Sequence, residues 1–155
     1  MTTSEHAVPG AWAPRAWFIS TREKLSRFPF SILQLGMRVG VGMVFFKAGL
    51  LKYNSFEFAV KLFEDEYKVP VLDPAVAARL AMLNELTIPI FLFLGLATRI
   101  ATLPLLGMIL VIQVFVYPSA WPDHALWGSA LILLLTRGPG ALSLDHLIER
   151  YFAKR

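Results

Sequence analysis

Three ionisable residues lie inside long apolar stretches of the sequence, where charges are rare. Arg38 and Lys47 fall in one stretch and Glu85 in the next. A charge within a bilayer is costly, so such residues usually pair with one another or mark a ligand site or a proton path. At 1.5 Å of rise per helical residue, Lys47, Glu85 and Arg38 would lie roughly 8, 15 and 22 Å from the outer interface. Both basic side chains can span the remaining ~7 Å, so we predict that Glu85 pairs with Lys47, with Arg38, or with both.

The spacing of small residues on the first helix favours Lys47. One face combines glycines with the lysine at 4-3-4 spacing: Gly36, Gly40, Met43 and Lys47. Small residues mark close helix contacts in membranes, so Lys47 is expected to point inward. Arg38 lies on nearly the opposite side, which has Gly42 and Gly49 of its own. Two structural alternatives stay open: an ion pair that only fixes helix register, and an Arg38 that extends to the cytoplasmic headgroups.

A second polar group is expected at the depth of Lys47. Gln113, Tyr117, His124 and Trp127 fall near the outer ends of the third and fourth apolar stretches. Together they could line a polar cavity that opens outward. Taken singly, Tyr117 and Trp127 are also typical of the aromatic belt at a membrane surface, and His124 could simply be solvated.

Several other chemistries are excluded by the residue types. The chain has no cysteine, which rules out thiolate metal sites and thiol–disulfide exchange by its own thiols. His6, His124 and His146 are too scattered for a metal motif, so no metal site is predicted. No phosphate-binding glycine loop or nucleic-acid-binding fold accompanies the basic residues, so no nucleic-acid partner is expected. No catalytic residue can be assigned.

The composition places these residues in a membrane protein. Of 155 residues, 56% are hydrophobic and only 17% are charged, against about 25% charged in soluble domains. A bilayer core requires about 20 apolar helical residues. The sequence predicts four spans, at about 31–51, 75–97, 100–117 and 124–136, the last being short. The predicted fold is an all-α, up-down-up-down bundle of four transmembrane helices.

Two shorter helices are expected outside the spans. Residues 16–30 resemble an interfacial helix with Trp17, Phe18, Leu25 and Phe28 as lipid anchors, after an N-terminal tail. Between the first two spans, an amphipathic helix is predicted from apolar residues at helical spacing: Phe56, Val60, Phe63 and Tyr67. We therefore divide the chain into residues 1–30, the tail and interfacial helix, residues 31–136, the four-span domain, and residues 137–155, a C-terminal helix.

The distribution of basic residues predicts the orientation. Nine Lys and Arg residues lie on the side that carries both termini, and three lie in the opposite loops: Lys52, Lys61 and Lys68. The positive-inside rule then places both termini in the cytoplasm.

The segment 138–145 is expected to be a structural cap. Gly138 and Pro139 end the fourth helix, and Ser143 is suited to cap a last helix that runs to about Phe152. In the functional alternative, Asp145 and His146 would form an acid–base pair, although adjacent helical residues do not face each other.

Residues 33–147 resemble the DoxX family of small four-helix bacterial membrane proteins. The resemblance rests on four pieces of sequence: Arg38-x-Gly40-x-Gly42-x-x-Phe45-x-x-x-Gly49-x-x-Lys52, Phe63 to Pro70, Asn84-Glu85-Leu86 with Leu94 to Arg99, and Gly138 to Asp145. Lys47 lies outside these motifs, and Thr87 and Pro89 replace the glycines usual after the glutamate.

The resemblance implies a protein of the bacterial inner membrane that is associated with redox or sulfur chemistry. Some members are similar to the membrane subunit of a thiosulfate:quinone oxidoreductase, and others are thought to assemble with redox partners. The sequence has no flavin motif or haem ligation pattern, so a redox centre would have to be a bound quinone or belong to a partner. Two functions remain open: a membrane subunit of a quinone-linked oxidoreductase, without an active site of its own, or a non-enzymatic scaffold or small-solute or metal handler with a structural ion pair. The expected partners are the lipid bilayer, proteins of a redox complex and further copies of the chain.

Overall fold

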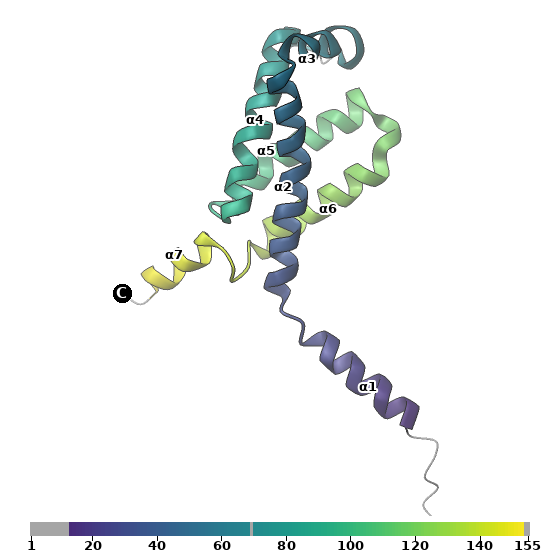
Figure 1. Ribbon diagram of the computed structural model, residues 1–155, viewed down its shortest axis with the longest axis vertical. Helices are drawn as coiled ribbons and strands as arrows, with labels where there is room; N and C mark the ends of the chain where they lie inside the picture. The colour runs from purple at the N-terminus through teal and green to yellow at the C-terminus, as the bar shows by residue number, and fades with distance from the viewer. Residues whose placement is uncertain (1–12, 69, 154–155) are drawn as a thin grey trace, which may run out of the picture.

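The computed structural model describes residues 13–68 and 70–153, and every regular element in these ranges is helical (Figure 1). The expectation of an all-α chain is therefore confirmed for the described residues. The elements follow in the order α1 (Ala13–Ser26), α2 (Phe30–Asn54), α3 (Phe56–Leu62), η1 (Phe63–Tyr67), α4 (Pro74–Leu94), α5 (Thr98–Val111), η2 (Ile112–Val116), η3 (Pro118–Ala120), α6 (Trp121–Arg137) and α7 (Leu144–Phe152). The tail predicted at residues 1–12 lies outside the described residues.

Three of the helices are long and apolar enough to cross a membrane. They are α2, α4 and the continuous helix Thr98–Val116 that α5 forms with η2. The fourth predicted span corresponds to α6, which has 17 residues. The four predicted ranges agree with these helices to within three residues at each end.

Each long helix packs against the next long helix in the sequence, and the last one also packs against the first. α2 has its most extensive contact with α4, α5 contacts both α4 and α6, and α6 returns to α2. A buried apolar core joins them, with Phe45 from α2, Leu92 from α4, Leu105 from α5 and Leu131 from α6 at its centre. In Figure 1 the α5–α6 hairpin leans away from α2 and α4 toward the end covered by α3, which we call the α3 end. The opposite end, beside α7, is the α7 end.

Local sequence determines where α4 starts and stops. The Asp73 carboxylate accepts hydrogen bonds from the amides of Ala75 and Val76 at 3.0 and 3.2 Å, and Pro74 occupies the first turn. At the other end, Gly95 adopts a φ of +64°, and the amide of Leu96 donates to the carbonyl of Phe91. This left-handed glycine cap allows α5 to begin only three residues later.

Two unusual turns occur at the α3 end. The helix α3 continues into the π-helical turn η1, and α5 continues into the π-helical turn η2. Such turns are rare and occur often at functional sites. The amphipathic helix expected between the first two spans is thus α3 with η1, and its last residue, Tyr67, faces Tyr117 just beyond η2.

Candidate functional site

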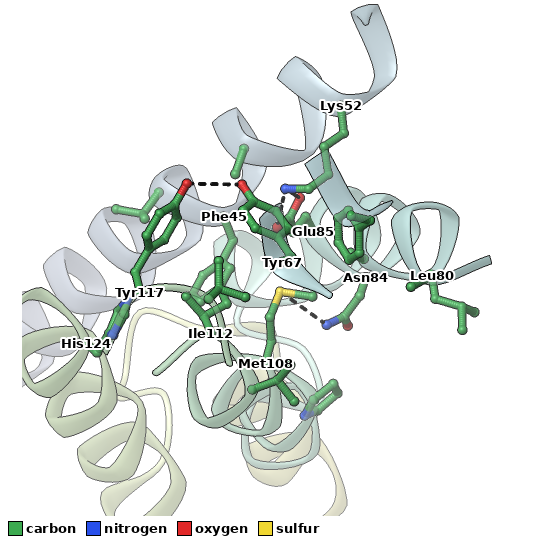
Figure 2. Close-up of a pocket in the computed structure, with 18 of the residues that line it drawn as sticks. Phe45, Lys52, Tyr67, Leu80, Asn84, Glu85, Met108, Ile112, Tyr117 and His124 are labelled. Carbon is green, nitrogen blue, oxygen red and sulfur yellow. Dashed lines mark hydrogen bonds and ion pairs between the residues drawn. The ribbon is translucent and has the colours of Figure 1, made fainter. Parts of the chain in front are cut away.

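A cavity of about 620 Å³ lies between α2, α4 and α5 at the α3 end. Its walls are mostly apolar, with Phe45 and Ala48 from α2, Leu80 from α4, and Met108 and Ile112 from the Thr98–Val116 helix. Figure 2 shows polar side chains around this apolar space: Lys52, Glu85, Tyr67, Tyr117 and His124. Cavities of roughly 300–1,000 Å³ with apolar walls and a few polar groups are typical of small-molecule sites.

A buried ion pair forms one side of the cavity. The Lys52 Nζ lies 2.8 Å from both carboxylate oxygens of Glu85, and the Glu85 side chain is only 4% exposed. Lys52 approaches from the last turn of α2, and its side chain keeps 18% of its surface exposed. The ammonium group therefore neutralises the carboxylate while remaining accessible from the α3 end.

A glycine brings α2 close enough for this contact. A Cβ atom on Gly49 would lie 2.9 Å from the Cβ of Glu85 and 3.0 Å from its backbone carbon, closer than real Cβ contacts allow. Only glycine permits such an approach of two helices without displacement. Gly49 and Lys52, three residues apart on one face of α2, thus both act on Glu85.

Two tyrosines link the π turns across the top of the cavity. The hydroxyl groups of Tyr67 and Tyr117 are 3.4 Å apart, and their rings meet edge to face at 5.7 Å (Figure 2). The Tyr117 hydroxyl also donates to Glu66 Oε1 at 3.2 Å. Burial, together with the hydrogen bond to Tyr117, raises the pKa of Tyr67 well above its ordinary value. Tyr67 therefore presents a neutral hydroxyl group near the cavity at neutral pH.

A buried histidine from the start of α6 forms another side of the cavity. His124 is 5% exposed, and its Nδ1 lies 2.6 Å from Gln113 Oε1. Trp127 follows one turn later, with its ring 5.6 Å from the imidazole, and makes an edge contact with Phe45. His124 and Trp127 line the cavity, whereas Gln113 supports the histidine from behind.

The predicted pairing of Glu85 with Lys47 is wrong, because Lys47 lies on the exposed side of α2. Gly36 and Gly40, which were expected on the packed face with Lys47, are exposed as well, and a Cβ on either would meet nothing within 4 Å. The packed face is the one that contains Arg38, Phe45 and Gly49.

The predicted approach of Arg38 to Glu85 is wrong too, and so is its extension to the headgroups. Arg38 is completely buried at the α7 end, where its Nη2 donates to the carbonyl of Leu142. Arg38 and Lys52 are 14 residues apart, or about 21 Å along the helix. Arg38 therefore belongs to a different structural feature from Glu85.

That feature is the segment Gly138–Asp145, which ties the helices together at the α7 end. Gln34 donates to the carbonyl of Gly138 at 2.9 Å. The Asp145 carboxylate accepts from the amides of Ala97 and Thr98 at 2.7 and 2.9 Å, which caps α5, and it interacts electrostatically with Arg38. We call these contacts the C-terminal clasp.

The predicted cap of the last helix is confirmed, since Ser143 Oγ accepts from the His146 amide at 3.2 Å and α7 ends at Phe152. The main partners of Asp145, however, lie on the α4–α5 connection, and nothing in the sequence pattern predicted this contact.

The DoxX family profile matches residues 33–118, from α2 to the start of η3. The chain belongs to the DoxX family. This is a family of membrane proteins. The chain is also similar to an uncharacterized protein of Haemophilus influenzae, with 29% identity over 126 residues that cover 75% of this chain and 83% of that protein. No solved structure matches the chain.

The DoxX match includes the site residue that helix-face reasoning missed. Lys52 ends the motif that begins at Arg38, and Gly49 stands in the same motif. The signal was available in the spacing, because Arg38, Gly42, Phe45, Gly49 and Lys52 follow a 4-3-4-3 pattern along one helix face. Tyr67 was predicted as a residue of the amphipathic helix but not of the cavity.

The arrangement in this DoxX protein can bind an amphipathic molecule. Lys52 offers a hydrogen-bond donor, the two tyrosines offer hydroxyl oxygens, and His124 offers a ring nitrogen. The apolar walls suit a ring or chain that is more soluble in lipid than in water. Within the described ranges, no three His, Asp or Glu side chains lie close enough together to hold a metal ion.

Proposed function

We propose that this chain is a membrane component of a quinone-linked oxidoreductase and that the cavity beneath α3 binds the quinone. The observation that carries the proposal is the cavity itself: apolar walls between the long helices, with hydrogen-bonding groups from four helical segments around one space. A quinone has the matching shape, because its ring bears two carbonyl oxygens and its remaining surface is apolar.

The residues around the cavity fit such a ligand. The Lys52 ammonium has three N–H groups and two Glu85 oxygens to satisfy, so one N–H remains to donate to a carbonyl oxygen. The hydroxyl groups of Tyr67 and Tyr117 lie around the same space. Phe45 and Trp127 can contact the ring through their aromatic faces. A bound quinone would supply reversible uptake of two electrons and two protons. The chain holds no cysteine, flavin motif or haem ligation pattern, so we assign the electron donor to a partner protein.

We further propose that α6 crosses the membrane as a fourth span. Its 17 residues extend about 26 Å, slightly less than a typical hydrocarbon core. With four crossings both termini lie on the cytoplasmic side of a bacterial inner membrane, as the excess of Lys and Arg at the α7 end favours. Reporter fusions at both termini should then give cytoplasmic signals, and a periplasmic signal from the C-terminal fusion would contradict the fourth crossing.

A non-enzymatic scaffold is the second candidate. It is favoured by the tight contact of Gly49 with Glu85, which is what an ion pair that fixes helix register requires. A scaffold has no need of a cavity with this volume, however, so ligand binding distinguishes the two functions.

The decisive experiment is a binding titration with decylubiquinone on the full chain in lipid nanodiscs. Ala48→Phe should fill the cavity from α2 and reduce the affinity at least tenfold. Ala125→Phe on the exposed side of α6 is the matched control and should bind like the wild type. Equal binding by both variants, or no binding by the wild type, would refute the quinone site and favour the scaffold.

A further inference from the structure

The imidazole of His124 is held in one orientation by a chain of two hydrogen bonds. The chain ends at the backbone carbonyl of Pro118, which can only accept. Gln113 Nε2 donates to this carbonyl at 2.9 Å. The amide is therefore oriented with its oxygen, Oε1, toward His124 Nδ1 at 2.6 Å.

This orientation determines which ring nitrogen carries hydrogen. An amide oxygen accepts only, so Nδ1 must be the donor, and a neutral imidazole has a single N–H. In the neutral form of His124, the remaining nitrogen, Nε2, thus carries a free lone pair. Gln113 acts as a positioning residue that selects this tautomer.

The free nitrogen is available to a ligand. His124 lines the cavity, and its Nε2 forms no hydrogen bond within the part of the chain that the structure describes. The residue as a whole is buried at the cavity wall, so its ring is shielded from bulk solvent.

The other polar groups of the cavity complement this acceptor. Both oxygens of Glu85 accept from Lys52, so the carboxylate is already engaged. On the opposite side, Nε2 of His124 accepts from no donor among the described residues. A buried acceptor of this kind is stabilised by a ligand that brings its own N–H or O–H group.

We propose that His124 Nε2 accepts a hydrogen bond from a hydroxyl group of the bound ligand, so that the cavity selects the reduced, hydroxyl-bearing form of a quinone. This inference rests on the proposed function and specifies the ligand form. A quinone carbonyl would place oxygen against the lone pair, whereas a hydroquinone hydroxyl donates to it. The expected difference is about tenfold in affinity, the equivalent of one hydrogen bond.

The tautomer is tested by ¹⁵N NMR on histidine-labelled protein in nanodiscs. The double change His6→Gln and His146→Gln leaves His124 as the single histidine. We expect a protonated Nδ1 and an unprotonated Nε2 in the neutral ring. Decylubiquinol should shift the Nε2 resonance, and its dimethyl ether, which lacks both hydroxyl groups, should not. A protonated Nε2 in the neutral ring would overturn the inference.

Affinity measurements test the same contact independently. His124→Phe should weaken decylubiquinol about tenfold and leave the dimethyl ether unchanged. Gln113→Leu removes the acceptor for Nδ1 and should lose the selectivity between the quinol and its ether. Equal effects on quinol and ether would overturn the role of His124 but leave quinone binding intact. Failure of the wild type to bind the quinone, the quinol or the ether would overturn both proposals.

Discussion

Removing the carboxylate of Glu85 should destabilise the protein because it leaves the Lys52 ammonium without its partner. The pair is short, at 2.8 Å to both oxygens, and the Glu85 side chain is 4% exposed. Breaking a buried ion pair from one side costs roughly 3–5 kcal/mol. Since Lys52 keeps 18% of its side-chain surface exposed and can recover some hydration, we expect the lower value, about 3 kcal/mol, for Glu85→Gln.

A double-mutant cycle isolates the pair from other effects of the substitution. Glu85→Gln, Lys52→Met and the double variant are unfolded reversibly in mixed detergent micelles, and the free energies of unfolding are compared. The double variant should lose less than the sum of the single losses, by roughly 1–3 kcal/mol, because it removes both charges and leaves neither without its partner. Lys47→Met is the matched control and should change the free energy by less than about 0.5 kcal/mol, since Lys47 is exposed.

The reasoning would be refuted if Lys52→Met behaved like Lys47→Met. Strict additivity in the cycle would lead to the same conclusion. Either result would mean that the Lys52–Glu85 contact contributes nothing to the packing of α2 against α4.

Three further predictions concern the contacts around the cavity and the C-terminal clasp. Gly49→Val should cost about 1–3 kcal/mol of unfolding free energy, because the valine side chain would overlap Glu85. Gly36→Val is the control and should be nearly neutral in the same unfolding assay, because a Cβ there meets nothing within 4 Å. Asp145→Asn should cost roughly 2 kcal/mol by weakening two charged hydrogen bonds to the start of α5, and hydrogen exchange should rise in the first turn of α5; unchanged exchange there would contradict the clasp. Burial and a hydrogen bond raise the pKa of Tyr67, so the folded protein keeps the phenol proton that the unfolded chain loses near pH 10. The free energy of unfolding should therefore fall as the pH rises above about 10. Tyr67→Phe should flatten this decline, and a variant with the wild-type pH profile would contradict the role of Tyr67.

The helices were predictable because the physical signal is strong. A membrane requires long apolar stretches with internally satisfied backbones, so their lengths follow directly from composition. The capping residues were equally local, and Ser143 was assigned from the residues beside it. The fourth crossing is harder to predict because α6 is short for a span.

The site was predicted less well because it depends on helix rotation and on contacts between distant segments. Glycines occur on two faces of α2, and those chosen, Gly36 and Gly40, point outward. An error of about half a turn exchanged Lys52 for Lys47 as the partner of Glu85. The clasp could not be read locally either, since Asp145 reaches an α5 that begins 47 residues earlier.

The central claim, that the cavity beneath α3 holds a quinone, is tested most directly by photolabelling the full chain in nanodiscs with an azido-quinone and mapping the labelled peptides by mass spectrometry. The account predicts label on the outer halves of α2, α4 and the Thr98–Val116 helix, around Ala48, Leu80 and Met108, and competition by excess decylubiquinone. Label confined to the C-terminal clasp or the lipid-exposed surfaces, or label that excess quinone does not displace, would contradict it.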